Sequence, residues 1–362
     1  MTDRPVVVIS EALDEGWAAW LGERADVRWA RFDNDGFDQA LVDAQGLIVR
    51  TYTKVTADLL DTAPGLRVVG RAGVGLDNID QDACQQHGVR VVYTPDANTQ
   101  AVVEYVLGLM LDHVRPRTDL PSGADAQAFH RMRQTEVGRD LGQMTLGVVG
   151  FGRIGRRVAR TASSLGMTVL ACDLLDEFQI GRDIVSSEVT PGSVRLTSHD
   201  EVYRASDIVT LHADGRARNR HMVGAAELAL FKRDALLINA ARGMLLDPAA
   251  LGDWLRDRPG ATAVLDVHDP EPPVANDPQD PLAGLANLRR LPHLASRTET
   301  ALGNMSAVAE DVWRVLQGHA PHWPAWRDAR DEPVDDADPA DPADPADGED
   351  GRAPDPDASP KA

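Results

Sequence analysis

Cysteine is scarce in this sequence, which holds only Cys84 and Cys172 among its 362 residues. Two cysteines cannot form a disulfide framework, and nothing around them has the spacing of a metal-binding motif. We therefore expect no metal site and a reducing compartment, for which the cytoplasm fits best.

Long apolar runs are missing as well. The N-terminus, "MTDRPVVVIS", has no basic region followed by a long apolar stretch, and no segment approaches about 18 uninterrupted apolar residues. The sequence thus predicts neither a signal peptide nor a membrane span.

Positive charge is in deficit, with 37 Lys and Arg against 57 Asp and Glu and a net charge of −20. Nucleic-acid binding needs a basic face, so we expect no nucleic-acid partner. Half of the net charge lies in residues 328–362, which contain thirteen acidic and three basic residues. Much of this segment is an Ala-Asp-Pro repeat. Such a segment has almost nothing to bury, so we expect residues 327–362 to be disordered.

What the chain does contain is apolar sequence, 43% of all residues, in a length that suits two domains. Short β-branched runs at 6–10, 46–49, 66–70 and 89–93 read as strands. Segments 11–24 and 56–63 between them have helical spacing. This alternation is typical of a parallel sheet with crossover helices.

A second α/β unit begins near residue 97. A long helix starts at about Thr99, with Asn98 or Thr99 as its N-cap, and is apolar on more than one face, which indicates burial against a large body such as a second subunit. A polar stretch, 116–143, follows. Further strands are expected at 207–212, 235–241, 261–267 and 288–294, and a final helix at 299–318.

A dinucleotide motif opens this second unit. Gly150, Gly152 and Gly155 form G-x-G-x-x-G directly after the apolar run "TLGVV" and before a helical pattern. The first glycine permits the tight turn, the second lets backbone approach the pyrophosphate, and the third lets the helix close on the strand. Asp173, at the end of the next strand, suits the ribose hydroxyls and would repel a 2′-phosphate, which favours NAD over NADP.

Three residues with suitable chemistry follow predicted strands. Arg242 comes after "LLINAA", Glu271 after "AVLDV" and His293 after "LRRL". Loops at the carboxyl ends of parallel strands gather where ligands bind. Spacing alone does not choose His293 over His212 or His268.

Six segments taken together resemble the D-isomer-specific 2-hydroxyacid dehydrogenases, in particular their 3-phosphoglycerate dehydrogenase branch. In chain order they are "LIVRTYTKVTADLLDTA", "VVGRAGVGLDNID", "LGVVGFGRIGRRVA", "INAARGMLLDPAAL", "LDVHDPEPP" and "LPHLASRTETA". The resemblance implies an α/β fold with two Rossmann-like or flavodoxin-like parallel-sheet domains. Residues 1–96 and 295–326 would form the substrate domain, with the NAD-binding domain, 97–294, inserted between them.

The resemblance also implies roles for single residues. His293 would be the acid/base, Glu271 would orient its ring, and Arg242 would hold the substrate's carboxylate and carbonyl. Backbone amides at Val74 and Gly75 would bind the carboxylate, and Asn98 would also contact the substrate. The implied NAD contacts are Gly150, Gly152, Arg153, Ile154, Gly155, Asp173, His212, Ala240 and Asp266.

A cluster of cations raises the question of a second negative group on the substrate. In the phosphoglycerate branch, positions matching Arg50 and Arg71 meet the phosphate side. Lys54 is a weaker addition, and Arg131 or Arg133 could come from a neighbouring subunit. The alternative is that Arg50 and Lys54 are ordinary solvated loop charges.

The expected function is hydride transfer between NAD and a D-2-hydroxy acid or 2-keto acid, with 3-phosphoglycerate as the leading substrate, in a homodimer. One alternative keeps the chemistry and changes the acid to glyoxylate, hydroxypyruvate or a phosphonate analogue. Another is an NAD(H)-sensing binding protein, like the corepressors similar to this family.

Some segments depart from the family's pattern. Asp214, Gly215 and Arg216 stand where Pro-Leu-Thr is usual, and residues 179–193 look like a surface insertion. The polar tail predicts no regulatory amino-acid-binding domain after residue 318.

Overall fold

The structure is a computed structural model that describes residues 4–115, 117–173 and 192–326. The acidic tail, 327–362, and most of the expected insertion, 179–193, lie outside the described residues. Within the described ranges, no helix is both long and apolar enough to cross a membrane.

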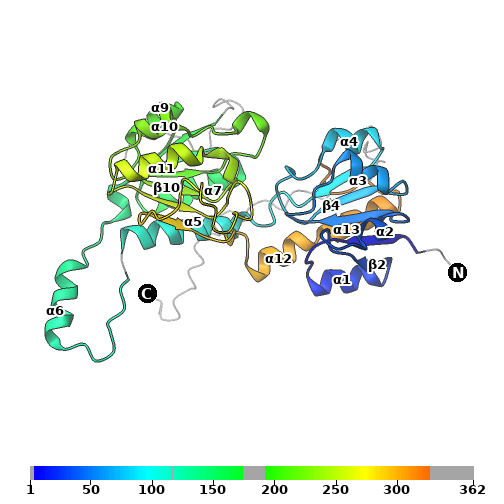
Figure 1. The fold of residues 1–362 in the computed structure, drawn as a ribbon, viewed down its shortest axis with the longest axis horizontal. Helices are drawn as coiled ribbons and strands as arrows, with labels where there is room; N and C mark the ends of the chain where they lie inside the picture. The colour runs from blue at the N-terminus through cyan, green and yellow to red at the C-terminus, as the bar shows by residue number, and fades with distance from the viewer. Residues whose placement is uncertain (1–3, 116, 174–191, 327–362) are drawn as a thin grey trace, which may run out of the picture. The chain divides into compact units, whose positions relative to one another are not determined.

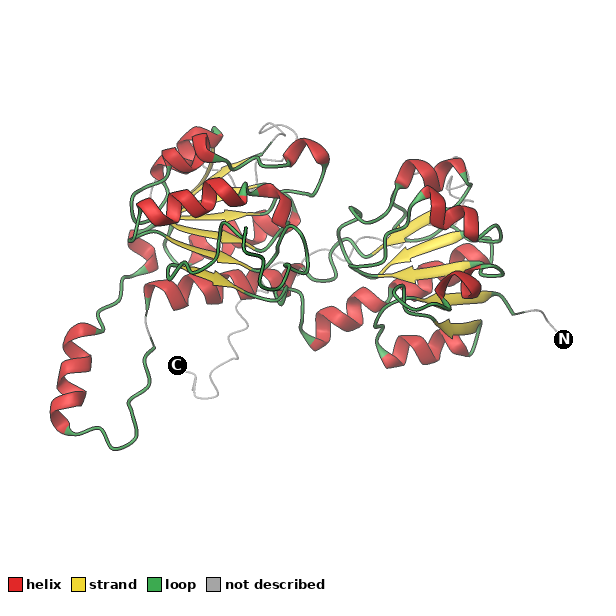
Figure 2. Cartoon of the chain, viewed as in Figure 1, coloured by secondary structure: helices red, strands yellow, loops and turns green. Residues whose placement is uncertain are grey.

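The N-terminal strands form one parallel sheet in the order β2-β1-β3-β4-β5 (Figure 2). The strands are β1 (Val6–Ile9), β2 (Asp26–Trp29), β3 (Gly46–Val49), β4 (Val68–Arg71) and β5 (Arg90–Tyr93). The apolar runs predicted the other four, but the edge strand β2 was missed because "DVRW" has no apolar run. Order 2-1-3-4-5 is that of flavodoxin-like sheets.

Within residues 6–93 of the described chain, three of the four helices begin at polar side-chain caps. The four helices are α1 (Glu15–Gly22), α2 (Phe37–Leu41), α3 (Ala57–Thr62) and α4 (Gln81–Gln86). The side chains of Asp14, Thr56 and Asp80 each accept a hydrogen bond from an N–H of the first turn. Such caps satisfy donors that have no partner inside the helix, so they fix where each helix starts.

The end of the described chain returns to this first sheet. Helix α13 (Val308–Leu316), orange in Figure 1, packs on β3, β4 and β5. A Cβ at Gly70 would lie 2.4 Å from a methyl of Val312, so the helix approaches the strand this closely because position 70 has no side chain. Further on, Tyr93 donates its N–H to the carbonyl of Trp323 at 3.1 Å.

The predicted helix 299–318 is two helices, α12 (Glu299–Ser306) and α13. The Ser306 hydroxyl donates to the Leu302 carbonyl at 2.8 Å and accepts the Asp14 N–H at 3.0 Å. Serine bonded back to its own helix in this way bends helices. The single-helix prediction was therefore wrong at this junction.

The second parallel sheet has the order β12-β11-β10-β9-β6-β7-β8. Its strands are β6 (Thr145–Val149), β7 (Thr168–Cys172), β8 (Val194–Leu196), β9 (Ile208–Leu211), β10 (Leu236–Asn239), β11 (Thr262–Leu265) and β12 (Leu288–Arg290). Counted from β6, this is the 3-2-1-4-5-6 Rossmann order with one added strand. Strand β12 ends before Pro292, which has no N–H for the ladder.

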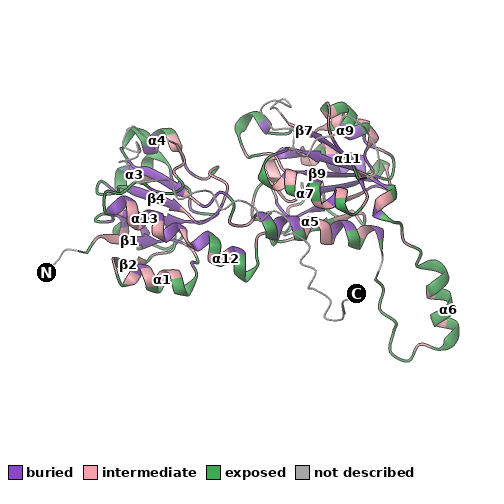
Figure 3. Cartoon of the chain, turned by 180° about the vertical axis from the view of Figure 1, so that it is seen from behind, coloured by how far each residue is buried: buried purple, intermediate pink, exposed green. Residues whose placement is uncertain are grey.

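The helices of this part are α5 (Thr99–Val114), α6 (Ala126–Thr135), α7 (Arg153–Ser164), α9 (His199–Ala205), α10 (Ala225–Leu230) and α11 (Pro248–Asp257), with short 3₁₀ turns at Leu141–Gln143, Ala217–Asn219 and Gly243–Leu245. Helix α5 begins at the N-cap Asn98 and packs on α7 and β10. By contrast α6, in the polar stretch where no element was predicted, buries none of its residues, as Figure 3 shows.

Both parts therefore have the expected α/β class with parallel sheets. The boundaries 1–96 with 295–326, and 97–294, stay a prediction.

Candidate active site

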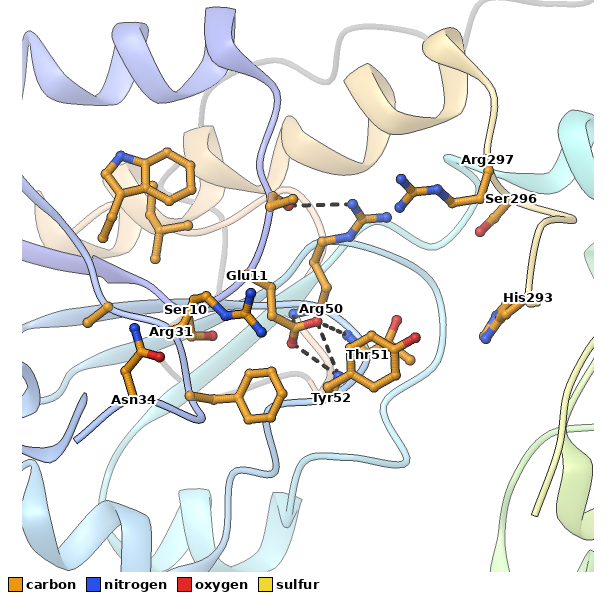
Figure 4. A pocket seen from close by; sticks show the side chains of 15 residues that line it. Ser10, Glu11, Arg31, Asn34, Arg50, Thr51, Tyr52, His293, Ser296 and Arg297 are labelled. Atoms are coloured by element: carbon orange, nitrogen blue, oxygen red, sulfur yellow. Dashed lines mark hydrogen bonds between the residues drawn. The ribbon is translucent and has the colours of Figure 1, made fainter. Parts of the chain in front are cut away.

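The first sheet has a cavity where its strand order reverses. Chain connections leave β1 and β3 in opposite directions, and ligands bind at the carboxyl ends of strands at such a point. The segments after β1, β2 and β3 line a cavity of about 520 Å³, together with His293 and Arg297 (Figure 4). Other lining residues include Glu11, Phe32, Arg50 and Tyr52.

Glu11, in the segment after β1, is hydrogen-bonded to the segment after β3. Its carboxylate accepts hydrogen bonds from four consecutive backbone N–H groups, those of residues 50–53, at 2.9–3.2 Å, and from the Thr53 hydroxyl at 2.9 Å. Burial acts to raise the pKa of Glu11, but these donors hold it below its ordinary value. The ionised carboxylate thus fixes the loop that carries Arg50.

The Arg50 side chain extends from this loop into the cavity, and among the described residues its guanidinium donates one long hydrogen bond, 3.4 Å, to the Ala12 carbonyl. Arg71, at the end of β4, is half-buried, and its Nε has no partner within the described residues. Burial and then the positive charge of Arg242 lower the pKa of Arg71 to about 10. Of the two cations predicted from the sequence, Arg50 lines the cavity, whereas Arg71 lies at the end of β4 and does not line it.

Arg242 comes from the loop after β10 and reaches the Val74–Gly75 segment. Its Nε donates to Asp77 at 2.8 Å and its Nη1 to the Ala241 carbonyl at 2.7 Å. A Cβ at Gly75 would lie 1.6 Å from Nη2 of Arg242, so this guanidinium occupies the space that any side chain at position 75 would fill. Asp77, which lies in the segment "VVGRAGVGLDNID" but was not among the predicted site residues, therefore holds Arg242 against the predicted carboxylate-binding amides.

His293 and Glu271 form the predicted pair, with 2.5 Å between Nδ1 of the ring and Oε1 of the carboxylate. Burial acts to raise the pKa of Glu271, but the hydrogen bond and charge of His293 keep it below its ordinary value. An ionised carboxylate only accepts, so Nδ1 is the protonated nitrogen. Nε2 then carries the lone pair of the neutral ring, and it has no hydrogen bond within the described residues.

The other two candidate histidines are engaged elsewhere. His268 bonds the Leu291 carbonyl through Nε2 at 2.8 Å. His212 bonds the Thr210 hydroxyl at 3.1 Å, and burial lowers its pKa to about 4, so its ring is neutral near pH 7. Of the three, His293 is the one that lines the cavity.

A buried carboxylate supports the His293 loop. Asp266 is fully buried, and its side chain accepts the N–H groups of Leu294 and Ala295 at 2.8 Å and the hydroxyl of Tyr105 at 3.1 Å. His293 itself has φ of 56°, a left-handed conformation that is uncommon outside glycine and enriched in Asn, Asp and His. Asp266, predicted as an NAD contact, thus holds the loop in which His293 lies.

The glycine motif has the geometry that dinucleotide binding requires. Gly150 has φ of 93°, and a Cβ there would lie 2.6 Å from the backbone of His212, at the point where the Rossmann-type order reverses between β6 and β9. A Cβ at Gly155 would lie 2.0 Å from the Gly150 carbonyl. Gly152 is the N-cap of α7, and nothing lies within 4 Å of its missing Cβ. Open space before a helix N-terminus fits a pyrophosphate.

Asp173, Arg153 and Ile154 adjoin this turn, and the remaining predicted contacts lie at the ends of other elements. Asp173 accepts the Phe151 N–H at 2.6 Å, which places its carboxylate at the turn after β6. Arg153 and Ile154 begin α7, and Ala240 follows β10. Asn98 has a buried Oδ1 with no partner within the described residues. Asp214, Gly215 and Arg216 form a loop in which a Cβ at Gly215 would lie 3.2 Å from Asp77.

Fold and site together define a dinucleotide-binding α/β protein with a cationic cavity and a histidine–carboxylate pair. Residues 107–295, more than half of the chain, match the D-isomer specific 2-hydroxyacid dehydrogenase NAD binding domain. The chain belongs to the D-isomer specific 2-hydroxyacid dehydrogenase family and carries its NAD-binding domain.

Individual relatives carry several names. D-3-phosphoglycerate dehydrogenase of Methanocaldococcus jannaschii is 34% identical over 86% of this chain and 57% of its own length. (S)-sulfolactate dehydrogenase of Chromohalobacter salexigens is 36% identical over 84% of this chain and 96% of its own. The crystal structure of the TT0316 protein from Thermus thermophilus has a TM-score of 0.73 and 30% identity, covering 89% of this chain and all of that one. This chain spans little more than half the length of the phosphoglycerate dehydrogenases that it matches.

Proposed function

We propose that this protein is an NAD-dependent dehydrogenase that interconverts a D-2-hydroxy acid and its 2-keto acid. The observation that carries the proposal is the pairing of His293 with Glu271 in the same cavity as Arg50. A histidine whose second nitrogen is oriented by a carboxylate is suited to acid/base catalysis, and His293 has such a partner in Glu271.

Each side chain then has a defined task. The turn of Gly150, Gly152 and Gly155 would hold NAD, which would supply the acceptor for the hydride on C2 of the hydroxy acid. Nε2 of His293 takes the proton of the C2 hydroxyl during oxidation and returns it during reduction. Glu271 keeps the other nitrogen protonated and faces the positive ring that results. Arg242, held by Asp77, binds the carboxylate and the C2 oxygen.

The cations at Arg50 and Arg71 favour an acid with a second anionic group. 3-Phosphoglycerate is the leading candidate, and several relatives are named for it. The relative named for sulfolactate indicates that a sulfonate is an alternative to the phosphate, as a phosphonate would be. Glyoxylate and hydroxypyruvate are the candidates that lack a second anion.

The test is NADH absorbance at one enzyme concentration with 3-phosphohydroxypyruvate, 3-sulfopyruvate, hydroxypyruvate and glyoxylate. We expect kcat/KM for one of the first two to exceed that for hydroxypyruvate by about tenfold or more, because charge-assisted hydrogen bonds to a second anion are worth over 1 kcal/mol. Equal rates would mean a general 2-hydroxyacid dehydrogenase. No turnover with any of them would contradict the proposal.

We also propose that the chain forms a homodimer. Helix α6 buries no residue, and the exposed fractions are 43% for Phe129 within it and 77% for Val137 just after it. A helix that buries none of its residues against the described part of its chain is marginal by itself and gains stability from a partner. Light scattering after size-exclusion chromatography should give twice the chain's mass of 39.1 kDa, whereas a monomer would refute this proposal.

A further inference from the structure

The cavity holds a second guanidinium that faces Arg50. Arg297 lies just before Thr298, the N-cap of α12, and lines the cavity together with Arg50, which follows β3. Figure 4 shows the two side chains pointing toward one another from different elements of the fold. Their guanidinium groups thus approach one region of the cavity from two sides.

Neither of these two charges is neutralised within the described residues. Arg50 and Arg297 form no ion pair there, and Arg297 donates no side-chain hydrogen bond. The third arginine of the cavity, Arg31, differs because Asp33 pairs with it through two hydrogen bonds of 2.9 and 2.7 Å.

Glu11 forms no ion pair with either guanidinium among the described residues, although its charge acts to raise the pKa of Arg50. Both of its oxygens accept the backbone N–H groups of residues 50–53, which hold the carboxylate on the backbone of this loop. Burial lowers the pKa of Arg50, and the positive charge of Arg297 lowers it further. An anion between the two guanidinium groups would replace this repulsion with attraction.

We propose that Arg297 is a specificity-determining residue that, together with Arg50, binds the distal oxyanion of the substrate. The inference rests on the proposed function, which supplies the reacting end of the substrate at His293. The group at the other end of the substrate, bound by Arg50 and Arg297, is then a tetrahedral oxyanion such as a phosphate, phosphonate or sulfonate.

The shape of the site favours this class. A tetrahedral oxyanion presents its terminal oxygens in three directions, so it can accept from two guanidiniums that come from different elements. A carboxylate has two oxygens in one plane and suits a single guanidinium fork. Arg71 lies outside the cavity lining and next to the charges of Arg242 and Asp77, so its contribution is the less direct one.

The test compares Arg297→Gln with Arg31→Gln, a matched change at the paired arginine of the same cavity. With NADH saturating, kcat and KM are measured for 3-phosphohydroxypyruvate, 3-sulfopyruvate and hydroxypyruvate. For Arg297→Gln we expect KM of the preferred anionic substrate to rise about tenfold or more, with kcat and the values for hydroxypyruvate changing less than about twofold. Arg31→Gln should behave as the wild type. Whichever anionic acid shows the effect identifies phosphate or sulfonate as the group bound.

Three outcomes would overturn the inference: equal losses for all acids, no loss in Arg297→Gln, or the same loss in Arg31→Gln. If the wild type turns over none of the acids, the proposed function fails. The anion site is then tested alone by calorimetric titration with inorganic phosphate and with sulfate. Weaker binding of either anion in Arg297→Gln than in Arg31→Gln would support the site, and equal binding or none would refute it.

Discussion

The two sheets use their backbone N–H groups differently at equivalent places, the points where the strand order reverses. Between β6 and β9, Gly150 and Gly152 leave backbone and open space before the N-terminus of α7. Between β1 and β3, the backbone N–H groups of residues 50–53 already bind an internal anion, the carboxylate of Glu11.

The difference explains the division of labour that we propose. Free N–H groups at a helix end suit a pyrophosphate, whereas amides that are already bonded to a carboxylate cannot bind another anion. An anion in the cavity at the first sheet must then be bound by side chains, and in our proposal Arg50 and Arg297 supply them. The strand order therefore predicts where a ligand binds, but it does not predict whether backbone N–H groups or side chains bind it.

The largest expected effect comes from His293. Because φ at this position is 56°, asparagine keeps the backbone conformation where alanine would strain it. His293→Asn should lower kcat by about 10²- to 10⁴-fold, the usual contribution of a positioned acid/base. His221, with φ of 54° and an exposed side chain, is the matched control, and His221→Asn should be fully active. An active His293→Asn enzyme would refute the catalytic assignment.

A side chain at Gly152 should weaken NADH binding at the second sheet. The missing Cβ faces open space and φ is −77°, so Gly152→Val should fold normally, yet its methyls would fill the space proposed for the pyrophosphate. We expect NADH affinity, measured by fluorescence titration, to fall by about a hundredfold, which corresponds to about 2.7 kcal/mol. Gly36→Val changes another helix N-cap that faces open space, with φ of −90°, and should bind NADH as the wild type does. Equal affinity in both variants would place the cofactor elsewhere.

A methyl group at Gly75 should displace Arg242. The clash is with the end of a flexible side chain, so Gly75→Ala should fold with little loss of stability. The guanidinium would move from its position beside Asp77, and kcat/KM should fall about tenfold, equivalent to about 1.4 kcal/mol of positioning. Gly303→Ala, where nothing lies within 4 Å, is the control. Unchanged kinetics in Gly75→Ala would argue against a role for Arg242 at this place.

Glu11→Gln should have the smallest effect on turnover and a clear one on stability. An amide nitrogen facing backbone N–H groups leaves donors unpaired, at a cost of about 1–3 kcal/mol in the free energy of unfolding. Because the pKa of Glu11 is lowered in the folded state, its stabilisation is complete above the ordinary value of 4.5 and is lost as pH falls through the lower folded value. Urea unfolding across that range should therefore show a weaker acid dependence in Glu11→Gln than in the wild type. Glu15→Gln, on an exposed first turn, should change neither, and an unaltered acid dependence in Glu11→Gln would contradict the loop role.

Local patterns explain what the sequence could predict. The glycine spacing at 150–155 and the apolar strands are short-range features, and both parallel sheets follow from them. Glu11 and Arg297 could not be predicted because their roles depend on partners in loops of other strands, which only the folded topology brings together. Strand β2 was missed for a related reason, since an edge strand needs few apolar residues.

The central claim is that the guanidinium groups of Arg50 and Arg297 bind the distal anion of the substrate, and that this binding does not depend on the cofactor. Its most direct test is the ratio of kcat/KM for the preferred anionic substrate to that for hydroxypyruvate, in the wild type and in Arg50→Gln, with NADH affinity titrated on the same samples. The account predicts that the ratio falls about tenfold or more in Arg50→Gln while NADH affinity stays unchanged. An unchanged ratio, or a parallel loss of NADH binding, would contradict it.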